Sequence, residues 1–182
     1  MNVIGERGWV CEPKPYRAYR YLLGEIGKRP LVCVGLNPSI AWRDQLDNTL
    51  KRVRNIAMNG GYSGWMMLNL YPQRATHPRD LANRRDVEWM NCNYRVIDNV
   101  FRQIREVCGY VDVWCAWGGI VRKRSYLCDC VRNLADVGSR YSVTWLRRGK
   151  ETKKGDPHHP LYVRNDEPLL PFDMVNYLRK LK

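Results

Sequence analysis

The stretch PLVCVGLNPS, residues 30–39, is the most informative segment for predicting the fold. Its first part is apolar or small at every position, which is typical of a central parallel strand covered on both faces. The run then breaks into Asn37, Pro38 and Ser39, so a buried strand ends in a stiff polar loop. Open α/β sheets bind their ligands just beyond the carboxyl ends of such strands, which makes this loop a candidate site.

The remaining strands and helices follow from the same kind of pattern. Apolar, β-branched or aromatic segments predict four strands, at 31–36, 65–70, 111–117 and 142–146. Helical periodicity predicts helices over 47–59, 89–107 and 124–134, and a last helix over 172–181. Strands that alternate with helices form parallel βαβ units with right-handed crossovers. We therefore expect one three-layer α/β/α domain, residues 1–182, around a short, mainly parallel four-stranded sheet.

The ends of the chain are expected to be simpler. Residues 1–16 form an extended or partly helical lead-in segment, because Pro13 and Pro15 interrupt any regular pattern. Residues 173–182 belong to a C-terminal helix that packs against one end of the sheet. In the long helix, the apolar stripe is expected to include Val96, Ile97, Val100, Ile104 and Val107.

The composition favours a polyanionic partner. The chain of 182 residues has 31 Lys and Arg against 18 Asp and Glu, a net charge of +13. Such an excess is typical of proteins that bind nucleic acid, nucleotides or acidic membranes, and a general solubility effect is the alternative. The seven cysteines are scattered without zinc-ligand spacing, and no stretch has the length of a signal peptide or a membrane span. We expect a cytoplasmic protein with reduced cysteines, no metal and no membrane association.

The four loops that follow the predicted strands are expected to converge on one edge of the sheet. They carry Asn37, Asn69, a Trp117-Gly118 turn and the pair His158-His159. A cleft built from them would also hold Asp47, Arg74 and several aromatic rings.

Each of these residues also has a purely structural interpretation. Asn37 is a common turn residue before proline, and Asp47 is well placed to cap the helix that follows it. One of the two adjacent histidines is expected to be a solvated loop residue, and Trp117 to be core. Arg74 is spaced to pair with Asp80 or Asp86.

Several separate motifs occur in a particular order along the chain. They are LNPS at 36–39, Asp47-x-Thr49, Gly61-Tyr62, Asn69-Leu70-Tyr71, Arg74-Ala75-Thr76, Ala116-Trp117-Gly118 and HPLY at 159–162. Over about residues 17–172 this combination resembles domain-of-unknown-function family 1643, which is found in bacteria and phages. More distantly, the layout is similar to the uracil-DNA glycosylase superfamily, whose members have a four-stranded parallel sheet between helices.

The glycosylase resemblance implies roles for particular residues. In the mismatch-specific branch, an Asn in a Gly-x-Asn-Pro loop activates water, and a His-Pro-Ser loop holds the leaving base and enters DNA. In the sequence Gly35-Leu36-Asn37-Pro38, the resemblance matches Asn37 to the water-activating Asn. It matches His159 to the His of the last loop. Ser39 stands where the first loop usually ends in Gly, and Leu161 replaces the Ser of the last loop. These departures argue against uracil itself and leave another flipped base or a free nucleotide.

The chemistry of the residues is compatible with this resemblance. Asn37 is expected to hold a water, Asp47 to act as base or electrostatic stabiliser, and His159 to donate to the departing base. A flipped base needs a pocket with aromatic walls and a basic approach surface. The other predicted ligand-binding residues are Gly35, Pro38, Ser39, Trp42, Thr49, Asn69, Tyr71, Arg74, Trp117, Gly118, His158 and Tyr162, with Arg52, Arg79, Arg122, Lys123 and Arg124 for phosphates.

Two functions from different classes remain open. The narrowly favoured one is a cofactor-free glycosylase-like hydrolase that acts on a modified or mispaired base, in DNA rather than RNA, or on a nucleotide. The other is a protein that binds and sequesters a nucleotide, a nucleotide signal or a modified base without cleaving it. A weaker third possibility is a basic protein that coats nucleic acid through its surface alone.

Overall fold

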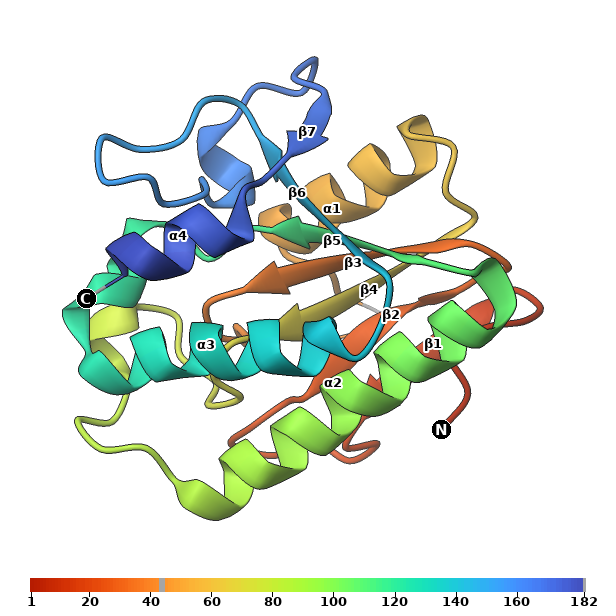
Figure 1. The fold of residues 1–182 in the computed structure, drawn as a ribbon. Helices are drawn as coiled ribbons and strands as arrows, with labels where there is room; N and C mark the ends of the chain where they lie inside the picture. Colours follow the sequence, from red (N-terminus) through yellow and green to blue (C-terminus); the bar gives the residue numbers. More distant parts are fainter. Residues whose placement is uncertain (43–44, 182) are drawn as a thin grey trace.

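The computed structural model describes residues 1–42 and 45–181 (Figure 1). An α/β fold is confirmed, with one sheet of seven strands and four helices among the described residues. The strands are β1 (Gly8–Glu12), β2 (Leu22–Ile26), β3 (Pro30–Gly35), β4 (Gly64–Asn69), β5 (Val111–Cys115), β6 (Val143–Arg148) and β7 (Leu169–Pro171). The helices are α1 (Asn48–Asn59), α2 (Val87–Cys108), α3 (Ser125–Ser139) and α4 (Met174–Lys180).

The sheet is mixed, and the prediction of a four-stranded sheet is wrong. Its strand order is β1-β2-β4-β3-β5-β6-β7. The four strands expected from the sequence lie in the middle, where β3 pairs in parallel with β4 and β5, and β5 with β6. Antiparallel strands extend the sheet on both sides, with β2 and β1 beyond β4 and β7 beyond β6.

The segment 1–16, expected to be an extended or partly helical lead-in, contains the strand β1, which pairs with β2. The neighbouring strand β2 was not predicted, because Gly24 and Glu25 interrupt its apolar run. At Gly24, an added Cβ would lie 2.2 Å from the Trp65 carbonyl oxygen of β4, so only glycine fits. Glu25 is buried and accepts hydrogen bonds from Arg54 Nε and Trp65 Nε1, so its charge is compensated inside the fold.

Helices cover both faces of the sheet and give it three layers. In Figure 1, α2 and α3 lie across one face, while α1 lies on the other. Two separate hydrophobic clusters match this arrangement. One contains Ile97 and Phe101 of α2 with Leu134 of α3, and the other contains Leu50 and Val53 of α1. The central strands are therefore buried on both sides, as their continuous apolar sequence requires.

The helix boundaries follow local capping signals. Asp47 accepts a hydrogen bond from the Leu50 backbone N–H and caps α1, and Asp86 caps α2 through Trp89 N–H. The long helix α2 ends at Gly109, whose φ of 82° is in the left-handed region. The expected stripe of α2 is buried at Ile97, but Val107 is 62% exposed in its last turn.

Candidate functional site

A cavity of about 610 Å³ lies at the carboxyl ends of the four parallel strands. Segments that follow β3, β4, β5 and β6 all contribute to its walls, together with the first turn of α1. The expected convergence of these loops is therefore confirmed, and the volume lies in the range typical of small-molecule sites. The predicted site residues that line it are Gly35, Asn37, Pro38, Ser39, Asp47, Thr49, Asn69, Trp117, Gly118, His158, His159 and Tyr162.

Asn37 is held in a fixed orientation by its neighbours. Its half-buried side-chain NH₂ group donates to the carbonyl oxygens of Ala75, at 2.9 Å, and Pro38, at 3.1 Å. Ala75 N–H in turn donates to the Pro38 carbonyl, which ties the loop after β3 to the segment after β4. Because the NH₂ group faces two carbonyls, the amide oxygen Oδ1 is the Asn37 atom left to accept a hydrogen bond from a ligand or water.

Asp47 serves as the N-cap of α1, which is the structural interpretation of this residue. One carboxylate oxygen accepts from Leu50 N–H at 2.8 Å, and the other accepts from the Ser39 hydroxyl. Ser39 Oγ also accepts from Ala41 N–H. Both Asp47 oxygens are thus engaged in holding the loop between β3 and α1.

His159 is held as a neutral imidazole. Its Nδ1 accepts a hydrogen bond from the Leu161 backbone N–H at 3.3 Å, at the start of the short 3₁₀ turn Pro160–Tyr162. Burial lowers the pKa of His159 below its ordinary value of 6.5, and the charge of Asp47 opposes this shift only in part. With Nδ1 as acceptor, the ring proton sits on Nε2, which is free to donate to a ligand.

All three histidines of the chain line this one cavity. His158 and His159 follow β6, and His77 comes from the segment after β4. Sequence reasoning missed His77, although it stands directly after the Arg74-Ala75-Thr76 motif. The cavity therefore gathers every imidazole side chain of this chain.

Asn69 is the least satisfied polar group in the cavity wall. It ends β4, its side chain is fully buried, and neither Nδ2 nor Oδ1 has a hydrogen-bond partner among residues 1–42 and 45–181. Gly35, its partner across the parallel pair, makes room for it, because an added Cβ there would lie 3.0 Å from Asn69 Oδ1. A donor and an acceptor stand side by side at this wall.

Trp117 and Gly118 shape the side of the cavity that follows β5. Trp117 is buried, and its Nε1–H donates to the Tyr177 hydroxyl of α4 at 3.1 Å. Gly118 has a φ of 71°, and a Cβ added there would lie 3.7 Å from His159 Cβ. A side chain at this position would be strained, so glycine is required where these two loops meet.

A buried carboxylate anchors the loop that carries the two adjacent histidines. Asp156 is 1% exposed and accepts from Arg122 Nε at 2.9 Å and from the Tyr177 hydroxyl at 2.9 Å. Thr152 Oγ1 accepts from the Asp156 backbone N–H and closes a tight turn. Asp156 thus fixes the segment between β6 and His158 against α4.

The structure places the other predicted site residues outside the cavity lining. Tyr71 is buried and accepts from Asp86 N–H. Arg52 donates to the Pro160 carbonyl, and Arg122 is committed to Asp156. Arg74 donates hydrogen bonds to backbone carbonyls. Of its two suggested partners, Asp80 pairs with Arg79 and Asp86 caps α2. Trp42 packs near Tyr16, Lys123 is exposed, and Arg124 contacts the Lys123 carbonyl.

Across residues 1–42 and 45–181, no group of three or more His, Cys, Asp or Glu side chains is arranged to hold a metal ion. No helix in the described part of the chain is long and apolar enough to cross a membrane.

Fold and cavity define the class: an α/β protein with a ligand-sized cavity at the carboxyl edge of its parallel strands. A family model described as "Protein of unknown function (DUF1643)" matches residues 20–161, so the chain belongs to this family. The match contains every cavity-lining residue except Tyr162. Comparisons with curated proteins and with solved structures found no match. The likeness to uracil-DNA glycosylases stays a prediction.

Proposed function

We propose that the cavity binds a nucleobase and that the protein hydrolyses the N-glycosidic bond of a modified or mispaired base. The observation that carries the proposal is the buried, unpartnered amide of Asn69 in the cavity wall. Leaving such a group unpaired costs about 1–3 kcal/mol, and a ligand with a matching donor and acceptor removes that cost. The Watson–Crick edge of a base offers such an adjacent pair.

Asn37 and His159 are suited to the chemical step. Hydrolysis breaks the bond between the sugar C1′ and the base nitrogen; water supplies hydroxide to C1′ and a proton to the departing base. Asn37 Oδ1 accepts a hydrogen bond from the attacking water, and His159 Nε2–H donates to an oxygen of the base as negative charge develops there. Both residues line the cavity with Asn69.

The rim of the cavity is suited to an extruded nucleotide. Leu161 and Tyr162 follow His159, line the cavity and are 43% and 78% exposed. An enzyme that removes a base from a stacked duplex pays the unstacking energy, and apolar or aromatic side chains that enter the stack offset it. We assign this role to Leu161 and Tyr162, with DNA favoured as the substrate.

A second candidate function is sequestration of a nucleotide or modified base without cleavage. The observation that favours it is the state of Asp47, whose two carboxylate oxygens already hold Leu50 N–H and the Ser39 hydroxyl. Asp47 is then a helix cap rather than a general base. Recovery of an intact nucleotide after long incubation with the protein, at a concentration that saturates it, identifies the binder.

The hydrolase proposal is tested on duplexes that each carry one modified or mispaired base, with abasic sites as the product scored. We expect wild-type protein to release at least one of these bases, and Asn37→Ala to lower the rate by about 10²-fold or more. Asn91→Ala removes an exposed amide from α2 and is the matched control with wild-type activity expected. Equal rates for Asn37→Ala and Asn91→Ala would refute the assigned role of Asn37.

A further inference from the structure

Arg20, in the cavity wall, has a second arginine as its neighbour, Arg74, which lies outside the cavity lining. Arg20 lines the cavity and is 1% exposed, and its Nη1 donates to the Ala41 carbonyl. Arg74 Nη1 donates to the same carbonyl at 3.2 Å and to the Ser39 carbonyl at 2.6 Å. The two guanidinium groups are therefore neighbours that share one acceptor.

Among the described residues, neither guanidinium group is fully satisfied: Arg20 Nε, Arg74 Nε and Arg74 Nη2 are buried and have no hydrogen-bond partner there. Within residues 1–42 and 45–181, neither arginine forms an ion pair with a carboxylate. The charge of Asp47 acts on Arg20, but both carboxylate oxygens of Asp47 accept hydrogen bonds from other groups. Buried charges are normally paired, so two neighbouring arginines without an ion pair favour an anionic ligand.

Aromatic rings hold Arg74 in place. Its guanidinium carbon lies 4.3 Å from the centre of the Tyr16 ring and 5.5 Å from that of Trp42. Stacking fixes the plane of the guanidinium and leaves its edge to form hydrogen bonds. A planar fork fixed in this way is suited to bidentate binding of a phosphate.

We propose that Arg20, in the cavity wall, and its neighbour Arg74 form a phosphate site beside the cavity, so that the ligand is a phosphate-bearing nucleoside rather than a free base. This inference deepens the proposed function and rests on it for the nucleoside part. The phosphate belongs either to a free nucleotide or to the backbone of a strand whose base enters the cavity. In both cases Asn69 contacts the base and the arginine pair contacts its phosphate.

The electrostatics are suited to an anionic ligand. Burial lowers the pKa of Arg20 to about 10, and the neighbouring charge of Arg74 contributes to the same shift. Burial also lowers the pKa of Arg74. Both groups are charged at neutral pH, and a bound anion would oppose the part of the Arg20 shift that comes from the charge of Arg74.

The phosphate site is tested first with inorganic phosphate alone. Thermal unfolding of the full chain is followed in sodium phosphate and in sodium chloride of equal ionic strength. We expect phosphate to raise Tm saturably in wild-type protein, and Arg74→Gln to weaken the apparent phosphate affinity at least tenfold. Arg84→Gln, which removes an exposed charge from the segment between β4 and α2, keeps the wild-type response.

Two results overturn the phosphate site: a wild-type response to phosphate no larger than to chloride, or equal responses in Arg74→Gln and Arg84→Gln. Arg74→Lys keeps the charge without the fork and serves as the second variant if Arg74→Gln does not fold. We expect it to retain part of the phosphate response. Arg20 is fully buried, so its variants are less suited to a first test.

A second arm compares nucleosides, their 5′-monophosphates and short single-stranded oligonucleotides by equilibrium binding. The site is supported if a phosphate-bearing ligand binds at least tenfold more tightly than its nucleoside and this gain is lost in Arg74→Gln. The ligand that shows the gain then identifies the source of the phosphate, a free nucleotide or a nucleic-acid strand. Equal affinity for nucleoside and monophosphate overturns it while leaving base binding intact. If phosphate binds through Arg74 and no nucleoside binds, the phosphate site is supported and the proposed binding of a nucleobase is refuted.

Discussion

Asn69 and Asn93 are both fully buried asparagines, but they differ in what their side chains contact. Asn93 Nδ2 donates to the Asn69 backbone carbonyl at 2.9 Å and to the Leu70 carbonyl at 3.4 Å. Neither side-chain polar atom of Asn69 has a partner. A buried amide that lowers stability is typical of a position retained for ligand binding.

The first prediction compares Asn69→Leu with Asn93→Leu by urea denaturation. Replacing the unpartnered Asn69 amide by an apolar group of similar size removes its desolvation penalty, so we expect stability to be unchanged or raised by up to about 1–3 kcal/mol. Asn93→Leu leaves backbone carbonyls unpaired and is expected to lower stability by about 1–3 kcal/mol. A loss of stability in Asn69→Leu as large as that in Asn93→Leu would contradict this account.

The second prediction concerns the pH dependence that His159 contributes to stability. Its pKa is lowered by burial in the folded state, so the unfolded state binds its proton more readily as the pH falls below about 7. The free energy of unfolding should therefore fall between pH 7.5 and pH 5.5 by more in wild-type protein than in His159→Asn. Asn keeps an acceptor for Leu161 N–H, and urea denaturation at the two pH values measures the difference. Equal pH dependence in the two proteins would show that His159 is not buried as described.

At the scale of elements, the four parallel strands could be predicted and the antiparallel strands outside them could not. Apart from Asn69 at the end of β4, β3 and β4 are apolar or small, so their sequence alone indicates burial on both faces. In β2, Gly24 and Glu25 break the pattern, and only the tertiary partners Trp65 and Arg54 explain them. A strand stabilised by such partners has no local signal.

Some residues of the candidate site could likewise be predicted from the sequence, and others could not. Asn37, Asn69 and His159 follow strand ends, so the topology rule for parallel sheets locates them. Arg20 precedes β2 and looks like surface charge in the sequence, although it is buried in the cavity wall. Arg122 looks like a phosphate contact but pairs with Asp156, because a charge in the sequence does not reveal its partner.

The third prediction concerns the segment between β6 and the adjacent histidines. Asp156 is buried and paired with Arg122, whose side chain is 16% exposed, so Asp156→Ala leaves a largely buried cation unpaired. We expect a loss of about 3–5 kcal/mol in the free energy of unfolding. Glu106→Ala breaks an exposed pair with Arg102 on α2 and should cost about 0.3–0.5 kcal/mol. A cost for Asp156→Ala as small as that for Glu106→Ala would mean that Asp156 does not anchor this segment.

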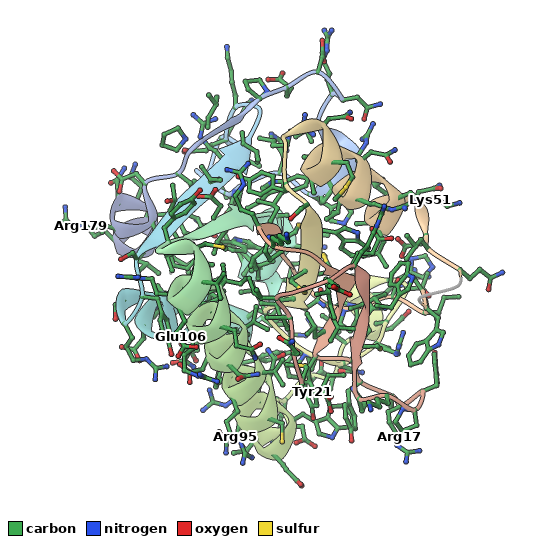
Figure 2. All side chains as sticks on the ribbon, turned by 90° about the vertical axis from the view of Figure 1, so that its right-hand side faces the viewer. Arg17, Tyr21, Lys51, Arg95, Glu106 and Arg179 are labelled. Carbon is green, nitrogen blue, oxygen red and sulfur yellow. The ribbon has the colours of Figure 1, made fainter. Side chains whose placement is uncertain are left out.

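At the scale of the whole molecule, the excess positive charge is distributed rather than gathered at the cavity. Figure 2 shows Arg17, Lys51, Arg95 and Arg179 around the periphery, and all four are exposed. They come from the segment before β2 and from α1, α2 and α4. A charge of +13 spread in this way attracts a polyanion from many directions without orienting it.

The fourth prediction separates this general attraction from the cavity. If about 6–10 phosphates are contacted, affinity for a duplex of unmodified sequence should fall by about 10³–10⁵ between 50 and 200 mM salt. Asn69→Leu should leave that affinity and its salt slope unchanged, because Asn69 is fully buried. The same variant should lose affinity for a base-modified ligand that enters the cavity. If it bound every base-modified ligand as tightly as the wild-type protein does, surface coating alone would account for binding.

The most direct test of the central claim is a crystal structure of the full chain with a nucleoside 5′-monophosphate bound. We predict that the edge of the base contacts both Asn69 Nδ2 and Oδ1, that the sugar lies beside Asn37 Oδ1, and that the phosphate contacts Arg74. A nucleotide bound elsewhere on the molecule, with the Asn69 amide still without a partner, would contradict the account.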